Sequence, residues 1–334
     1  MNKIWNERQG QTEEVILGGG VNPNKDVTTY VDVSINRYLD KVIEGYCENI
    51  LGKFPDNSID LIVTSPPYAD QRDYGSTGTR ISADKYCDWF IPKAKELYRV
   101  LNNTGNFVLN INDKVINGKQ STYVYELIIE LTKSIGFNLV RDYVWHNPAT
   151  PPNIFSSGNY GRTKKSHEYL YWFSKSDSWY FNIDPIRKPY SKGMMKYLNG
   201  QGNGNRSHNK RPSTHSFDCE KTWKDNGGSD PGSVLTVSNT SSVDRFSVMC
   251  KEKGVHHPAR FPEKLVEFFI LSGSREGDIV LDPFCGSGTT LISAHRNSRR
   301  WIGIDANRVY CELAKDRFDD EFYLQVECLL KENL

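Results

Sequence analysis

The segment from residue 279 to residue 294 constrains the fold of this chain more than any other. Three apolar residues predict a short strand, and Asp-Pro-Phe-Cys-Gly-Ser-Gly then leads into an apolar stretch that predicts the first turns of a helix. Gly286 and Gly288 allow close approach to the backbone, and the helix start presents free N–H groups to a carboxylate. Strand, glycine turn and helix in this order predict an α/β fold with a nucleotide-type binding site.

A second apolar strand, residues 59 to 64, stops at Ser65-Pro66-Pro67-Tyr68. Proline fixes φ and has no N–H, so the two prolines cannot continue a strand ladder, and the carbonyls of Ser65 and Pro66 can face a ligand. Rigid acceptors beside the Tyr68 ring suit a flat amine. Taken alone, the tetrapeptide is equally consistent with a plain proline turn.

The two motifs resemble those of the S-adenosylmethionine-dependent DNA amino-methyltransferases. That family has a catalytic loop of the form Ser/Asp/Asn-Pro-Pro-Tyr/Phe and a cofactor loop that contains Phe-x-Gly-x-Gly. With the catalytic loop first, the order resembles the permuted beta subgroup, whereas glutamine and ribosomal-RNA methyltransferases have the reverse order. The resemblance covers about residues 46 to 173 and 257 to 318. It implies a circularly permuted class I methyltransferase fold: a Rossmann-like, doubly wound, mostly parallel sheet with an inserted target-recognition region.

The resemblance implies S-adenosylmethionine as the cofactor. Asp305, at the end of a second short strand, would accept the ribose hydroxyls, and the alternative is that it only caps a helix. Pro262 ends a segment that matches His-Pro-x-x-x-Pro and would pack beside the methionine moiety. Two other interpretations of the glycine turn are disfavoured. An NAD site would need a third glycine and a phosphate-binding loop would need a lysine after the glycines, and neither is present at this turn. The other residues assigned to the cofactor are Asp282, Phe284, Gly286, Gly288 and Thr289.

At the catalytic loop, the resemblance implies direct methyl transfer to an exocyclic base amine, without a metal or a covalent enzyme intermediate. Such an amine is a poor nucleophile because its lone pair is delocalised, so acceptors for its N–H bonds would favour the reactive geometry. The Ser65 side chain and the Pro66 carbonyl are the candidate acceptors. Pro67 completes the rigid turn, and Tyr68 can stack on a base flipped out of the duplex.

The target base is predicted from the first residue of the tetrapeptide. In the family, Ser-Pro-Pro-Tyr is mostly found in N4-cytosine enzymes and Asp-Pro-Pro-Tyr in N6-adenine enzymes. We therefore prefer cytosine and keep adenine as the alternative. Methylation of the cytosine ring carbon would need a thiolate on a Pro-Cys dipeptide, and this sequence has none.

Two further polar groups carry alternative interpretations. His167-Glu168-Tyr169 resembles a family motif near the target base, but a structural His–Glu pair explains it equally well, so we leave it outside the catalytic core. The polar residues 70 to 74 could clamp the base or the DNA backbone, or form a solvated loop.

The pattern along the chain predicts four segments. Residues 1 to 35 form an extension of unclear role, 36 to 175 the catalytic half, 176 to 255 the target-recognition region and 256 to 334 the cofactor-binding half. Expected strands are 59–64, 106–111, 139–145 and 169–174, and expected helices are 84–101, 123–135 and one starting near 261 with Pro262 in its first turn. Gly105 and Gly136 are expected to end the first two helices.

The net charge is only +1, but residues 185 to 226 hold nine lysines and arginines against three acids. Cationic side chains can neutralise phosphates, while Arg, Asn and Gln can read base edges. The resemblance implies double-stranded DNA as the partner, and this stretch is its candidate contact region, with a solvated linker as the competing interpretation. The candidate DNA-binding residues are Arg72, Arg162, Lys164, Lys165, Arg206, Lys210 and Arg211.

Other features set the expected context. Apolar runs are strand-sized and the N-terminus lacks the apolar run of a signal peptide, so we expect a cytoplasmic protein without membrane contact. Seven scattered cysteines without a Cys-x-x-Cys pair argue against zinc and disulfides. A modification enzyme with a cognate restriction endonuclease, or one working alone, fits this picture. RNA or protein amide methyltransferases and a catalytically silent DNA-binding protein are the rival functions, and the oligomeric state stays open.

Overall fold

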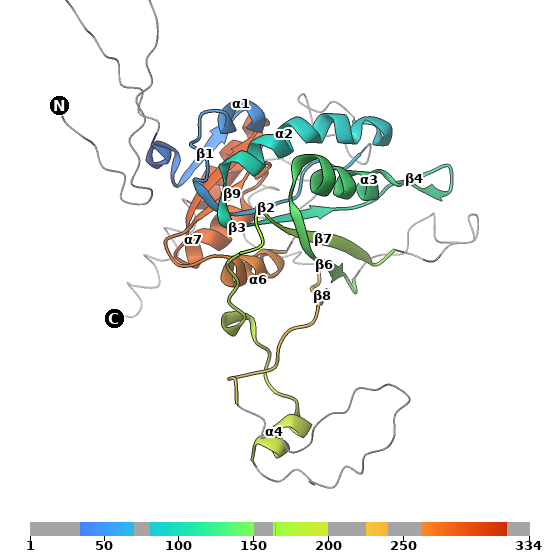
Figure 1. The fold of residues 1–334 in the computed structure, drawn as a ribbon, viewed down its shortest axis with the longest axis vertical. Coiled ribbons are helices and arrows are strands. Elements are labelled where there is room, and N and C mark those ends of the chain that lie inside the picture. The colour runs from blue at the N-terminus through green and yellow to red at the C-terminus, as the bar shows by residue number, and fades with distance from the viewer. Residues whose placement is uncertain are drawn as a thin grey trace, which may run out of the picture.

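The computed structural model describes residues 34–69, 81–149, 163, 165–199, 225–239 and 262–318. Its centre is one large twisted sheet with helices on both faces (Figure 1). A separate two-stranded hairpin consists of β4 (Val115–Ile116) and β5 (Lys119–Gln120). No helix among the described residues is long and apolar enough to cross a membrane.

The large sheet has eight strands, and those in its first half are all parallel. β7 (His167–Ser174) runs antiparallel to both of its neighbours, and β8 (Val234–Thr236) pairs in parallel with β6 (Asn138–His146) at the far edge. In order across the sheet, the strands are β1 (Lys41–Glu44), β10 (Arg300–Asp305), β9 (Ile279–Asp282), β2 (Ile59–Thr64), β3 (Leu101–Ile111), β7 (His167–Ser174), β6 (Asn138–His146) and β8 (Val234–Thr236).

Helices cover the two faces of the sheet separately. α1 (Cys47–Leu51), α2 (Tyr86–Val100) and α3 (Tyr123–Glu130) lie on one face, and α6 (Glu263–Gly273) and α7 (Thr289–Arg296) on the other (Figure 1). Successive residues of β2 separate accordingly, since Ile62 belongs to the apolar cluster under α2, while Leu61 and Val63 belong to the cluster under α6 and α7. The helical bounds are η1 (Ile35–Tyr38), α1 (Cys47–Leu51), η2 (Ala83–Lys85), α2 (Tyr86–Val100), α3 (Tyr123–Glu130), a π-helical turn (Leu131–Ile135), η4 (Asp184–Ile186), α4 (Lys192–Leu198), α6 (Glu263–Gly273), α7 (Thr289–Arg296) and a last helix at 308–318.

Chain order and spatial order differ most at the centre of the sheet. β2 and β9 are neighbours, with Leu61 opposite Val280 and Ile62 opposite Leu281. The loop that follows each strand therefore emerges at the same edge of the sheet. Ligands of open α/β sheets bind at this carboxyl edge.

The predicted doubly wound, mostly parallel fold is confirmed, and each of the four expected strands is present. Gly136 ends the π-helical turn with φ 101°, as its position predicted. The expectation for Gly105 is wrong, because α2 already ends at Val100 and Gly105 lies inside β3. A Cβ at Gly105 would lie 2.9 Å from the Asp60 carbonyl oxygen, so close strand packing requires this glycine.

Two other boundaries also differ from expectation. Pro262 precedes α6 as its N-cap instead of lying in the first turn. β1, from the predicted catalytic half, pairs with β10, from the predicted cofactor-binding half. The described part of the predicted target-recognition region, 176–255, includes α4 and the sheet strand β8. Most of residues 1 to 35 lies outside the described residues.

Candidate active site

Asp282 connects the two motifs. Its Oδ1 accepts a hydrogen bond from the Thr64 hydroxyl at 2.7 Å, and its Oδ2 accepts one from the Thr290 hydroxyl at 2.6 Å. The backbone N–H of Phe284 also donates to Oδ1, at 3.1 Å. Asp282 is buried. The carboxylate thus joins the end of β2 to the cofactor loop and to the first turn of α7.

Burial dominates the ionisation of Asp282. It raises the pKa of this carboxyl to about 6, while the hydrogen bonds from Thr290, Thr64 and Phe284 act in the opposite direction. Three donors directed at one carboxyl suit the ionised form.

The predicted glycine turn lies between β9 and α7. Gly286 and Gly288 have φ values of 49° and 76°, in the left-handed region that favours glycine. Gly288 is also the N-cap of α7, whose first intrahelical bond runs from the Ile292 N–H to the Gly288 carbonyl. The N–H groups that precede this bond have no intrahelical partner and form the positive end of the helix. Thr289, the first residue of α7, is buried.

Asp305 lies at the carboxyl end of β10, beside the glycine turn. The N–H of Gly286 donates to its Oδ2 at 2.9 Å, and the N–H of Asn307 donates to its Oδ1 at 2.8 Å. Burial raises the pKa of this carboxyl, and the two backbone hydrogen bonds oppose the shift. The cap of the next helix, which starts at residue 308, is Asn307, whose Oδ1 accepts a hydrogen bond of 3.0 Å from the Val309 N–H, so Asp305 is not itself the cap. A carboxylate has about four acceptor positions, so two bonds leave capacity for hydroxyl groups.

The remaining loop residues divide into aromatic and packing positions. Phe284 is half-buried and lies 5.8 Å from Trp89 and 6.4 Å from Phe90, measured between ring centroids. Cys285 is buried, and burial raises the pKa of its thiol, which suits a packing role and disfavours a thiolate. A Cβ at Gly303 would lie 3.0 Å from the Cys285 sulfur, so the two residues pack closely against each other.

The catalytic loop, residues 65–68, is held in place by a hydrogen bond from α2. Pro66 is buried, and the Pro67 carbonyl accepts a hydrogen bond of 2.8 Å from the hydroxyl of Tyr86, a fully buried residue of α2. The Ser65 hydroxyl lies 3.2 Å from the Tyr68 hydroxyl. Both side chains remain half-buried at the edge of the sheet.

Two residues from neighbouring strands complete this loop. Asn110, near the end of β3, accepts hydrogen bonds through Oδ1 from Ser65 at 3.2 Å and from Tyr68 at 2.9 Å. Glu168, in β7, accepts one through Oε2 from Tyr68 at 2.8 Å. Sequence reasoning missed Asn110 and Thr64 and left Glu168 out. The resemblance of His167-Glu168-Tyr169 to a family motif was the only signal for Glu168.

Of the seven predicted DNA-binding residues, only Lys165 lies in the described part of the chain. Lys165 donates hydrogen bonds to Asn112 at 2.5 Å and to Asp113 at 2.6 Å, so its ammonium group is paired just beyond the end of β3. The residues 70 to 74 lie outside the described part of the chain, as do Arg72, Arg162, Lys164, Arg206, Lys210 and Arg211.

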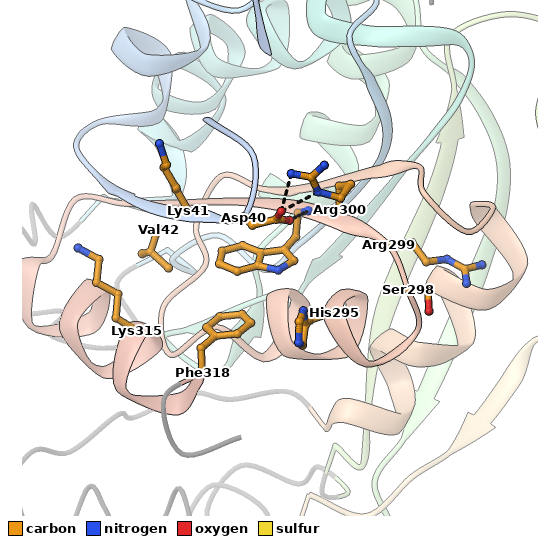
Figure 2. A pocket seen from close by; sticks show the side chains of 10 residues that line it. Asp40, Lys41, Val42, His295, Ser298, Arg299, Arg300, Lys315 and Phe318 are labelled. Atoms are coloured by element: carbon orange, nitrogen blue, oxygen red, sulfur yellow. Dashed lines mark hydrogen bonds and ion pairs between the residues drawn. The ribbon is translucent and has the colours of Figure 1, made fainter. Parts of the chain in front are cut away.

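A cavity of about 740 Å³ lies away from this site (Figure 2). Its lining includes Lys41 and Arg300, the first residues of β1 and β10, with His295 and Phe318 from the helices beside them. Asp40 and Arg300 form an ion pair there (Figure 2). Because both motifs lie at the carboxyl ends of the strands, this cavity at the amino ends is not part of the candidate active site.

A doubly wound sheet that brings a glycine turn and a proline-ended acceptor loop to adjacent strand ends, in this chain order, defines the permuted α/β methyltransferases. The chain belongs to the N6/N4 DNA methylase family, since the family model described as DNA methylase matches residues 59–316.

Individual relatives agree with this assignment. The chain is 36% identical over 279 residues to the type II methyltransferase M.PvuII of Proteus hauseri, covering 81% of each chain. It is 32% identical over 277 residues to the orphan methyltransferase M.BamHII of Bacillus amyloliquefaciens, covering 80% of this chain and 92% of the relative.

Solved structures show the same architecture. A structure of the PvuII DNA methyltransferase, described as cytosine-N4-specific, matches with a TM-score of 0.63 and 29% identity, covering 83% of this chain and 85% of that one. A structure of a putative DNA modification methylase of Thermus thermophilus, complexed with S-adenosyl-L-methionine, matches with a TM-score of 0.52 and 24% identity, covering 84% of this chain and 93% of that one. This second match supports the fold alone.

Proposed function

We propose that this protein methylates the N4 amine of cytosine in double-stranded DNA, with S-adenosylmethionine as the methyl donor. The observation that carries the proposal is the contact between Thr64 and Asp282, which fixes the Ser65–Tyr68 loop beside the glycine turn. The serine at position 65 and the cytosine-N4-specific structural relative support cytosine over adenine.

The residues present at the glycine turn suit the cofactor. Asp305 has acceptor capacity for ribose hydroxyls, and the first N–H groups of α7 can bind a carboxylate. The half-buried Phe284 offers an aromatic surface, and Pro262 would pack beside the methionine moiety. When bound, S-adenosylmethionine supplies an electrophilic methyl group, which is attached to a positively charged sulfonium sulfur. Because the carboxyl of Asp282 is enclosed by its partners, we assign it the shaping of the loop and no direct cofactor contact.

The chain's own contribution to the reaction is orientation and hydrogen bonding. Ser65 and the Pro66 carbonyl accept N–H bonds from the target amine and favour its pyramidal form, while Tyr68 stacks on the flipped base. These acceptors do not distinguish the two kinds of base amine, so N6-methylation of adenine is the second candidate. A silent binding protein is disfavoured because Ser65, Tyr68 and Asp305 are all in place.

DNA recognition is assigned to residues 176–255. In the described part, α4 lies well away from the sheet and carries Lys192 and Lys196 (Figure 1). Phosphate contacts by such cations would position the duplex. We include a cognate restriction endonuclease in the proposal, because M.PvuII is described as a type II methyltransferase; the orphan relative makes action without one the alternative. The cytoplasm is the corresponding location.

Incorporation of labelled methyl groups tests the substrate class. The purified protein, labelled S-adenosylmethionine and unmethylated duplex DNA should give label that deoxyribonuclease releases and protease leaves in place. Label that survives deoxyribonuclease would contradict a DNA substrate.

A further inference from the structure

Glu168 contacts the catalytic loop although it lies 100 residues further along the chain. Antiparallel pairing of β3 with β7 sets Asn110 opposite Leu170, so Glu168 extends past Asn110 toward the loop. The Tyr68 hydroxyl lies 2.8 Å from Glu168 Oε2 and 2.9 Å from Asn110 Oδ1. One phenolic proton therefore faces two acceptor oxygens.

The orientation of the Asn110 amide is fixed from its other side. Its Nδ2 donates to the backbone carbonyl of Tyr169 at 3.1 Å, which leaves Oδ1 for the loop. Asn110 is only 2% exposed, so water does not replace these partners. An amide oxygen can only accept, and an ionised carboxylate can also only accept.

These acceptors decide where the hydroxyl protons point. The Tyr68 proton is directed at Glu168 and Asn110, with the charged oxygen as the stronger acceptor. The Ser65 proton then has Asn110 Oδ1 and the Tyr68 oxygen as its partners, both at 3.2 Å. Both protons are directed into the protein, and a lone pair of the Ser65 oxygen remains for a ligand.

We propose that Glu168 is a positioning residue for methyl transfer: by accepting the Tyr68 hydroxyl proton, it makes Ser65 an acceptor for an amine N–H of the target base. This inference rests on the proposed function and names how the site selects its substrate. A loop whose hydroxyls face inward accepts an N–H donor and offers nothing to a ring carbonyl, so the site favours an amino base over a keto base.

A double-mutant cycle between Glu168 and Tyr68 tests this role. The variants are Glu168→Ala, Tyr68→Phe and the two combined, assayed for kcat and KM with unmethylated duplex DNA and labelled S-adenosylmethionine. Glu168→Ala should lower kcat about 10- to 100-fold, as for the loss of a hydrogen bond to a charged group. In the Tyr68→Phe background, Glu168→Ala should change kcat less than about twofold, because the hydroxyl through which Glu168 acts is gone.

Two further variants separate positioning from general structural damage. Glu168→Gln keeps an acceptor oxygen and should retain several-fold more activity than Glu168→Ala. Asp142→Asn removes an exposed carboxylate from the adjacent strand β6 and should leave kcat within about twofold of wild type. The KM for S-adenosylmethionine should be unchanged in all single variants.

Equal effects of Glu168→Ala in the two backgrounds would overturn the proposal, and so would an unchanged kcat in Glu168→Ala. Methyladenine as the wild-type product would instead overturn the base assignment, while the coupling between Glu168 and Tyr68 could still be measured. The two failures are therefore distinguishable.

Discussion

The Thr64 hydroxyl donates to Asp282 Oδ1 at 2.7 Å, although 218 residues separate them in the chain. Thr64 is the last residue of β2 and Asp282 the last of β9, so this bond joins the ends of the two strands that carry the motifs. The loops that follow them are thereby held at a fixed separation, which alignment of a base amine with a methyl donor requires.

Removal of the Thr64 hydroxyl should destabilise the fold. Thr64→Val keeps the shape but takes one donor from a buried carboxylate, and we expect a loss of about 1–3 kcal/mol in the free energy of unfolding. Urea denaturation measures it. Thr122→Val, which loses an exposed hydroxyl bonded to Glu126, serves as the control and should stay within about 0.5 kcal/mol of wild type. Equal effects of the two substitutions would refute the bridging role.

Asp282 should make stability depend on pH. Its pKa in the folded state is about 6, above the value of about 3.9 expected in the unfolded chain, so the folded state binds the proton more tightly. This contribution to stability is present at pH 4 and is lost as the pH rises through 6. The variant Asp282→Asn serves as the reference, because an asparagine side chain does not titrate, yet its amide can still pair with Thr64 and Thr290.

The free energy of unfolding of wild type relative to Asp282→Asn should therefore fall between pH 4 and pH 7. The fall is a few kcal/mol at most, since one pKa unit corresponds to about 1.4 kcal/mol. Urea titrations of both proteins across this range measure the difference. A difference that is constant, or that grows with pH, would show that the carboxyl stays ionised in the folded protein.

Gly288→Ala should weaken cofactor binding as well as stability. Gly288 has φ 76°, and a Cβ there would lie 3.1 Å from Ala314 Cβ. Gly277→Ala is a matched control, because Gly277 has φ 79° and open space around a Cβ. Both substitutions should cost about 1 kcal/mol of stability, through the left-handed backbone. Calorimetric titration with S-adenosylmethionine should show weakened affinity for Gly288→Ala alone, and equal affinity of both variants would exclude the glycine turn as the binding site.

Gly303→Ala should overpack the junction of β10 and α7. The added Cβ would lie 2.4 Å from Leu291 Cδ1, so we expect a loss of about 1–3 kcal/mol. Gly232→Ala, where a Cβ meets nothing within 4 Å, should be nearly neutral. Shortening the neighbour in the double variant Gly303→Ala, Leu291→Ala should recover part of the overpacking loss relative to the sum of the single effects. Additive losses on thermal unfolding would count against the clash.

The motifs could be predicted from the sequence because each lies within one local unit. An apolar run followed by two prolines, or by Gly-x-Gly and a helix, determines its own backbone, and the strand, glycine turn and helix occur in the predicted order. The contacts of Tyr68 with Asn110 and Glu168 depend on the register of three strands, which a single sequence does not determine. The prediction that Gly105 ends a helix was wrong for the same reason, because the close neighbour of Gly105 is the Asp60 carbonyl of another strand.

The most direct test of the account is a nucleoside mass analysis of unmethylated duplex DNA after incubation with the protein and labelled S-adenosylmethionine. Wild type should yield N4-methylcytosine, and Tyr68→Ala should yield little or none while its cofactor affinity is retained. N6-methyladenine would keep the fold and the mechanism but contradict the choice of base. Undiminished methylation by Tyr68→Ala would contradict the site itself.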